Sequence, residues 1–327
     1  MSALYLPMFA LVAGILGLLW GADRFVAGSA GAARNFGISP MVIGLTLVSV
    51  GTSAPEIIVS INAALSNVPQ MAVGNALGSN LANIGLVLGI TALVAPLPVQ
   101  KHLLREESPT LLLITALAGL CLYDGFLHRG ESIALALLTI PLLIVIVKYK
   151  KNHPNPEAVE EAEEIPVLPM AKAGLLFVVG LVVLLVSARV TVWGAQSIAV
   201  YAGISELIIG LTVVAIGTSL PELAASVMSA LKGHHDIALG NVFGSNLFNL
   251  MLVMTSAGAI APMALDQEVF ARDFAAMAFM TVLMIALVAL ALRKSPQKAR
   301  LSRGLGLVLL AGYGFYYVLL WPAITAV

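Results

Sequence analysis

The stretch GTSAPEIIVS at residues 51–60 returns as GTSLPELAAS at residues 217–226, and each copy lies inside a long apolar run. Around these stretches, residues 37–96 align with residues 203–262 at a constant offset of 166, with 28 of 60 positions identical by direct count. The identities include the polar strings G-T-S-x-P-E and G-N-x-x-G-S-N-L. A duplication kept for packing alone explains apolar similarity, but it does not explain polar residues that recur in register.

The composition predicts a membrane protein. Hydrophobic residues make up 60% of the 327-residue chain and charged residues only 10%, whereas soluble domains carry about 25% charged residues. The net charge is zero, so no basic surface points to nucleic acid. The single cysteine, Cys121, excludes an intrachain disulfide. The first apolar run lacks the basic residues of a cleavable signal, and we expect it to remain as a spanning helix.

The predicted fold class is all-α and polytopic, with ten membrane-spanning segments of roughly 20 or more residues. The expected spans are 3–33, 38–66, 70–95, 108–124, 130–148, 171–201, 205–231, 237–261, 273–292 and 304–322. Five spans separate equivalent points of the two copies, and an odd number inverts the second copy in the membrane. We therefore expect two inverted five-helix repeats, at 1–148 and 171–327, joined by a polar linker at 149–170.

Basic residues orient this arrangement, because cytoplasmic loops collect Lys and Arg. With the N-terminus outside, thirteen fall on the cytoplasmic side: Arg34, Lys101, Arg105, Lys148, Lys150, Lys151, Lys172, Lys232, Arg293, Lys294, Lys298, Arg300 and Arg303. Only Arg129 and Arg272 fall on the outer side, while Arg24 and Arg189 lie within spans. Both termini are therefore predicted to be outside. Asp23 and Arg24, in the first span, are expected to pair with each other or to lie at the interface. Arg189 is the repeat equivalent of Asp23, and a contact between Asp23 and Arg189 is the alternative.

The strings Ser53-Ala54-Pro55-Glu56 and Ser219-Leu220-Pro221-Glu222 fit helix capping boxes. Each lies near the middle of an apolar run, so each predicts a spanning helix broken at mid-membrane. Broken backbone at that depth must be buried in protein or line a wet cavity. An acidic residue there costs about 2.5–3.5 kcal/mol, and a cap contributes only about 1 kcal/mol. Capping alone is therefore too weak a reason for two intramembrane glutamates.

A bound cation is a better reason. The Glu56 carboxylate, the Thr52 and Ser53 hydroxyls and the free carbonyls at the helix break are hard oxygen ligands, and Thr218, Ser219 and Glu222 repeat them. Calcium takes 6–8 such oxygens. The next span of each copy adds Ser79 with Asn83, and Ser245 with Asn249, on one helix face. For Asn75, Asn80, Asn241 and Asn246, interhelical hydrogen bonding remains an equal alternative. The absence of Cys and His from both motifs argues against zinc or copper.

With GTSAPE and GTSLPE beside GNALGSN and GNVFGSN, the chain resembles the cation/calcium antiporter superfamily over nearly its whole length. The resemblance is to the sodium/calcium exchanger type, and in particular to its short bacterial inner-membrane members. It implies one pocket that holds either calcium or sodium ions and alternates its access. Glu56 and Glu222 would ligate calcium with the Thr52 and Thr218 carbonyls.

The resemblance also implies sodium sites. They would be formed by Thr52, Ser53, Ser79, Thr218, Ser219, Ser245 and the carbonyls of Ser49 and Ala215. Some prokaryotic relatives carry Asp where this chain has Asn249, which leaves the usual three-sodium ratio as an expectation. The expected function is calcium/sodium antiport. The alternative is a proton- or potassium-coupled antiporter of calcium or another divalent cation.

Other classes fit less well. An enzyme is disfavoured because neither an H-E-x-x-H, a Walker A nor a G-x-S-x-G string occurs. A channel or a scaffold that uses polar residues to join helices remains open. Ion flux without a counter-ion would favour a channel, and no ion flux at all would favour a scaffold. We expect no cofactor beyond the transported ions, and no partner beyond those ions and the lipid bilayer. The expected assembly is a monomer.

Overall fold

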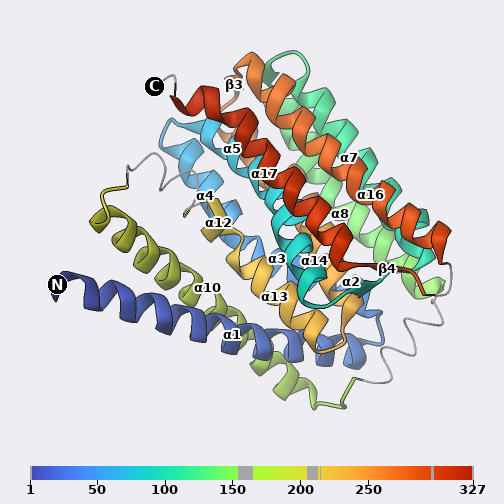
Figure 1. Ribbon diagram of the computed structural model, residues 1–327. Helices are drawn as coiled ribbons and strands as arrows, with labels where there is room; N and C mark the ends of the chain where they lie inside the picture. The colour runs from blue at the N-terminus through green and yellow to red at the C-terminus, as the bar shows by residue number, and fades with distance from the viewer. Residues whose placement is uncertain (1, 154–164, 205–212, 214, 296–297, 326–327) are drawn as a thin grey trace.

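The computed structural model describes residues 2–153, 165–204, 213, 215–295 and 298–325, and it is built almost entirely from helices (Figure 1). The α-helices are α1 (Ser2–Phe36), α2 (Pro40–Ile43), α3 (Ser49–Thr52), α4 (Ala54–Leu65), α5 (Pro69–Ala82), α6 (Leu88–Val94), α7 (Ser108–Leu122), α8 (Arg129–Asn152), α10 (Met170–Tyr201), α12 (Ala215–Thr218), α13 (Leu220–Leu231), α14 (His235–Phe248), α15 (Met254–Ile260), α16 (Ala275–Lys294) and α17 (Arg303–Thr325).

π-Helical turns join several of these helices into longer elements. They are η1 (Gly44–Val48), η2 (Asn83–Val87), η3 (Leu103–Glu107), η5 (Asn249–Val253) and η6 (Val269–Phe274). Two short antiparallel pairings close loops: β1 (Leu97–Pro98) pairs with β4 (Arg300–Leu301), and β2 (Phe126–Leu127) pairs with β3 (Met263–Ala264). Because each pairing joins residues far apart in sequence, the loops of the two halves of the chain meet at both ends.

Among the described residues, seven helical elements are long and apolar enough to cross a membrane, and the bent pair Pro40–Thr52 and Ala54–Leu65 makes an eighth. α7 and α13 occupy the expected spans 108–124 and 205–231, but they have only 15 and 12 described residues. Most of residues 205–214 lies outside the described part of the chain. α8 continues to Asn152, so the expected linker at 149–170 begins as helix. The chain is a helical membrane protein.

α1 and α10 lie side by side and run obliquely past the other helices (Figure 1). Glycine makes this close approach possible. A Cβ atom added at Gly180 of α10 would lie 2.2 Å from the backbone nitrogen of Phe25 in α1, and one at Gly28 would lie 2.3 Å from that of Phe177. Real side chains do not tolerate such distances, so the two backbones pack directly against each other.

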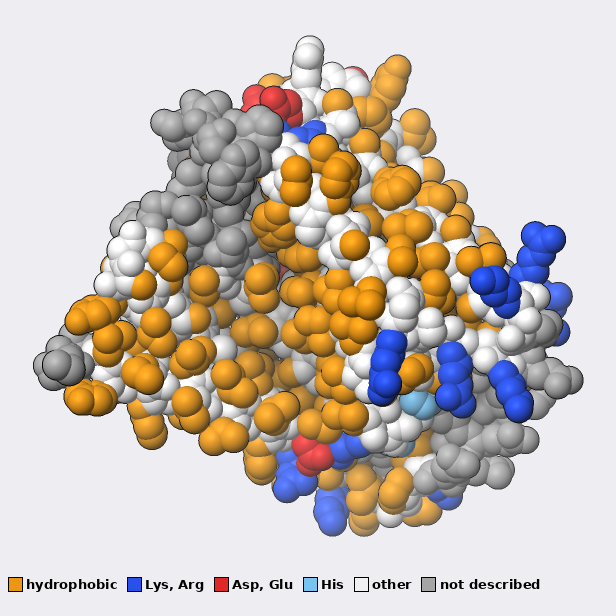
Figure 2. Space-filling model, in the orientation of Figure 1, with side chains coloured by type: hydrophobic (Ala, Val, Ile, Leu, Met, Phe, Trp, Pro, Cys, Tyr) orange, Lys and Arg blue, Asp and Glu red, His pale blue; other side chains and the backbone are white. Residues whose placement is uncertain are grey.

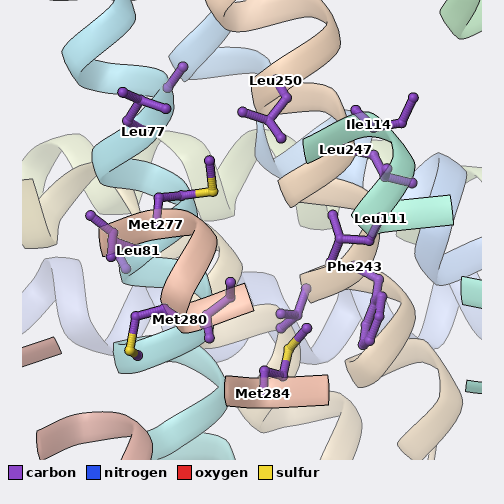
Figure 3. Packing of buried hydrophobic residues seen from close by; sticks show 14 of the residues in the cluster. Leu77, Leu81, Leu111, Ile114, Phe243, Leu247, Leu250, Met277, Met280 and Met284 are labelled. Atoms are coloured by element: carbon purple, nitrogen blue, oxygen red, sulfur yellow. The ribbon is translucent and has the colours of Figure 1, made fainter. Parts of the chain in front are cut away.

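The core lies between α5, α7, α14 and α16, where Leu, Ile, Phe and Met side chains interdigitate (Figure 3). Leu77, Leu111 and Phe243 are each at most 1% exposed. The outer surface is apolar as well. Figure 2 shows hydrophobic side chains over most of one face, with Lys and Arg gathered toward the end where β4 lies. A lipid-facing exterior around a packed helical core follows from this distribution.

A buried ionic cluster joins η3, α8 and α14. His102 Nδ1 lies 3.0 Å from Glu107 Oε2, and Lys150 Nζ lies 2.6 Å from Glu107 Oε1 and 2.5 Å from Glu106 Oε2. His102 Nε2 is 3.9 Å from Asp236 Oδ2. Burial opposes charge on both partners, but their mutual hydrogen bond and attraction raise the pKa of His102 and lower that of Glu107. The cluster therefore contributes stability while both groups are ionised.

Glu107→Gln is expected to lower the free energy of unfolding by about 3 kcal/mol, because it removes the buried carboxylate that His102 and Lys150 share. Glu106→Gln, on a half-buried carboxylate, should cost less than about 1 kcal/mol. The loss of stability should be largest between pH 4.5 and 6.5, which are the unperturbed pKa values of Glu107 and His102. Above that window, stability from His102 is lost as pH rises through its raised pKa; below it, stability from Glu107 is lost as pH falls through its lowered pKa. Thermal unfolding in detergent across pH would check this, and equal losses for both variants would contradict it.

Candidate cation site

The first GTSxPE copy is broken at a single residue. α3 ends at Thr52, α4 begins at Ala54, and the two segments meet at a bend of 45°. Pro55 is the local cause, since it has no N–H to donate to the carbonyl four residues earlier, at Gly51. The predicted break is therefore present, as a bend with one free carbonyl rather than as two separated half-helices.

The predicted capping boxes are wrong. Neither Ser53 nor Ser219 makes a side-chain cap hydrogen bond. The second helical position of each segment is a proline without an N–H, and the Ser53 backbone (φ −83°, ψ 2°) is not in the extended conformation of a usual cap. The Ser53 hydroxyl instead donates to Oε1 of Glu222 over 3.2 Å. This hydrogen bond joins the two copies of the motif across the centre of the molecule.

The second copy repeats the arrangement. α12 runs from Ala215 to Thr218, Ser219 lies at the break, and α13 begins at Leu220 with Pro221 and Glu222 in its first turn. Ser219 Oγ is buried and has no hydrogen-bond partner among the described residues.

Two asparagines hold the breaks in place by matching hydrogen bonds. Asn75 Nδ2 donates to the Glu56 carbonyl (3.3 Å) and to Ser60 Oγ (3.2 Å). Asn241 Nδ2 donates to the Glu222 carbonyl (3.3 Å) and to Ser226 Oγ (2.9 Å). The hydrogen-bonding interpretation of these two asparagines is therefore confirmed. The serine partners were not predicted, although Ser60 and Ser226 are identical in the aligned repeats.

Asn83 and Asn249 begin the π-helical turns η2 and η5, at equivalent positions of the two copies. π-Turns inside α-helices recur at functional sites because the extra residue turns side chains out of register. Asn83 Oδ1, Ser245 Oγ and both side-chain polar atoms of Asn249 are buried without a hydrogen-bond partner in the described part of the protein. Such groups are costly to bury unless a ligand completes their bonding.

The two carboxylates dominate the electrostatics of the site. Glu56 and Glu222 are each 1% exposed, and they interact with each other by charge repulsion. Oε2 of each is buried without a hydrogen-bond donor among the described residues, and neither carboxylate forms one of the ion pairs found there. Two buried carboxylates that are not ion-paired to a cation of the described residues are costly unless a bound cation or a proton neutralises them.

The structure buries most of the predicted site residues. Ser49, Thr52, Ser53, Ser79, Asn83, Ser219, Ser245 and Asn249 are each at most 4% exposed. Thr218 is half-buried. Ala215 begins α12, and the role expected of its carbonyl stays a prediction. Among the other asparagines, Asn80 Nδ2 donates to the Asn246 carbonyl (3.2 Å), which again links the two copies.

The donor set consists of hard oxygens. The described residues contain no group of three or more His, Cys, Asp or Glu that could form a conventional metal site. Two carboxylates with hydroxyl, amide and backbone oxygens suit calcium or sodium, which accept flexible oxygen coordination.

Comparison with known proteins agrees with this chemistry. The family model "Sodium/calcium exchanger protein" matches residues 6–148 and 172–321. The chain is 45% identical to the putative antiporter CaxA of Alkalimonas amylolytica, over 95% of this chain and 98% of that protein. It is 30% identical to the sodium/calcium exchanger MaX1 of Methanosarcina acetivorans, over 95% of this chain and 97% of the relative.

Solved structures of the sodium-calcium exchanger NCX_Mj share the fold. One, soaked with 2.5 mM Na⁺ and 0.1 mM Ca²⁺, has a TM-score of 0.80 at 32% identity and covers 96% of this chain and 98% of that one. Another, soaked without either ion, has a TM-score of 0.81 at 31% identity with the same coverage. On both the family model and these relatives, the chain belongs to the sodium/calcium exchanger protein family.

Proposed function

We propose that the protein is a secondary antiporter that exchanges calcium for sodium across the membrane by alternating access. The observation that carries this proposal is the pair of buried carboxylates, Glu56 and Glu222, on two related helix breaks. Each has an oxygen without a hydrogen-bond partner, and neither is ion-paired to a cation of the described residues. Membership of an exchanger family supports a transporter rather than an enzyme.

The proposed cation ligands are the two carboxylates and the neutral oxygens that surround them. They are Glu56, Glu222, Thr52, Thr218, Ser53, Ser219, Ser79, Ser245, Asn83 and Asn249, with the carbonyls of Ser49 and Ala215. Two carboxylates balance one calcium or two sodium ions, so the two cargoes compete for the same oxygens. A third sodium ion would carry uncompensated charge in a low dielectric. An empty site leaves the carboxylates unneutralised, which penalises switching without cargo and couples the two fluxes.

The proposed architecture is ten spans in two inverted five-helix repeats, 1–148 and 171–327, with a cytoplasmic linker at 149–170. We place both termini outside, in an inner-membrane monomer. The matched hydrogen bonds of Asn75 and Asn241 and the matched π-turns at Asn83 and Asn249 support the repeat. The excess of basic residues in the expected cytoplasmic loops supports the orientation.

Proteoliposomes test the coupling ion. Vesicles loaded with sodium and diluted into sodium-free buffer should take up radiolabelled calcium, and vesicles loaded with choline should not. Calcium uptake driven by a proton or potassium gradient, with the sodium gradient collapsed, would overturn sodium coupling in favour of the alternative antiporter. Equal calcium uptake without any counter-ion gradient would indicate a channel instead.

A further inference from the structure

A cavity of about 220 Å³ opens beside the two helix breaks. Its inner wall contains Pro55 and Pro221, the residues that directly precede Glu56 and Glu222, together with Thr218. Its other wall is the face of α10 that carries Arg189 and Trp193. The cavity therefore leads from α10 to the proposed cation site, although neither glutamate lines it.

Arg189 is the one charged side chain among the described residues that line this cavity. It is exposed, and it takes part in none of the hydrogen bonds or ion pairs found in the described part of the chain. The expected contact with Asp23 does not form, because Asp23 pairs with Arg24 at 2.8 Å and with Lys232 at 2.6 Å. The guanidinium charge of Arg189 in the cavity is therefore not neutralised by Asp23.

Arg189 also lies deep along its helix. α10 ends at Tyr201, twelve residues later, which is roughly 18 Å at the usual helical rise. Charged residues at such depth in a membrane protein are costly and face water-filled paths or partners. Because no described residue is hydrogen-bonded or ion-paired to Arg189, we attribute its position to a water-filled path, and the cavity supplies one.

We propose that Arg189 is a specificity-determining residue of the passage from the outer side to the cation site, which it biases toward monovalent over divalent cations. This inference rests on the proposed function. A fixed positive charge raises the free energy of a passing cation in proportion to the cation's own charge. If the charge slows sodium entry by a given factor, it slows calcium entry by the square of that factor. Competing sodium thus gains an advantage at the outer mouth.

Trp193 provides a measurement that does not depend on transport, because it lines the same cavity and is 46% exposed. In a Trp20→Phe, Trp321→Phe background it is the single tryptophan left of three. Its fluorescence can be quenched by caesium, cobalt(II), iodide and neutral acrylamide. Collisional quenching is linear in quencher concentration, which separates it from saturable binding at the cation site.

Arg189→Gln should raise the quenching constant about threefold for caesium and about ninefold for cobalt(II), lower it about threefold for iodide, and leave acrylamide unchanged. Arg189→Lys should behave as the parent, and about 0.5 M choline chloride should shrink every difference by screening. Lys172→Gln, an exposed cation at the other end of α10, is the matched control and should change nothing. Equal changes for all four quenchers, or no change, would overturn the inference.

Transport provides the second arm. In proteoliposomes, Arg189→Gln should raise kcat/KM for external calcium about tenfold and for external sodium about threefold, with cytoplasmic-side values unchanged. An active variant with unchanged kcat/KM for external calcium would overturn this inference alone. A parent protein that exchanges neither ion would instead overturn the proposed function, and the quenching measurement would then still test the inference about Arg189 on its own.

Discussion

Glu56→Gln is expected to reduce sodium-driven calcium uptake by more than a factor of about one hundred. The substitution keeps the shape of the side chain but removes one of the two charges proposed to neutralise calcium. A buried ion that loses one of its opposite charges is destabilised by about 3–5 kcal/mol. Because Glu56 is 1% exposed and its Oε2 has no protein donor among the described residues, nothing nearby can replace the charge. Initial rates of radiolabelled calcium uptake into sodium-loaded proteoliposomes measure the effect.

Glu222→Gln should have the same effect, since it is the equivalent residue of the second copy and is equally buried. Glu131→Gln is the matched control, because Glu131 lies exposed in the first turn of α8. Its uptake should equal that of the parent protein. If either Glu56→Gln or Glu222→Gln kept parental uptake while the protein remained folded, the assignment of that carboxylate as a calcium ligand would be wrong.

Gly180→Ala is expected to disrupt the packing of α1 against α10. The new methyl group would lie 2.2 Å from the backbone nitrogen of Phe25, so the two helices must move apart along their contact. Overpacking of this kind costs about 1–3 kcal/mol or more. Because α1 and α10 both contact α13, whose first turn carries Glu222, we expect uptake to fall at least about tenfold as well, an effect of more than 1.4 kcal/mol.

Gly174→Ala on the same helix is the control. Gly174 is exposed, and a Cβ atom there meets no described atom within 4 Å. Because alanine favours helix more than glycine by up to about 1 kcal/mol, this variant should be as stable as the parent or slightly more so. Thermal unfolding in detergent and calcium uptake should be measured on both. Equal behaviour of the two variants would show that the α1–α10 contact is not tight.

The repeat made much of the site predictable. Polar identities in register located Glu56 and Glu222 at buried helix breaks, and hydropathy placed most helix ends within a few residues. α10, for example, was expected at 171–201 and runs from Met170 to Tyr201. Such features depend on local sequence and on periodicity, which a single chain displays directly.

Features that depend on contacts between distant segments were missed. The Ser53 hydroxyl was assigned to a cap, yet it donates to Glu222 in the other copy. The pairing of Asp23 with its neighbour Arg24 is confirmed, but the alternative contact with Arg189 does not form, and the second partner of Asp23, Lys232, was not predicted. The π-turns that begin at Asn83 and Asn249 could not be predicted from apolar periodicity, because one extra residue in a helical turn does not change the composition of the segment. These details required the relative placement of helices.

Equilibrium binding of radiolabelled calcium to the solubilised protein tests the central claim most directly, because it needs neither a membrane gradient nor a turnover cycle. The parent protein should bind about one calcium ion per chain, sodium should displace it competitively, and a Glu56→Gln, Glu222→Gln variant should bind none. Calcium binding that survives in the double variant, or that sodium fails to displace, would contradict a single shared site built on these two carboxylates.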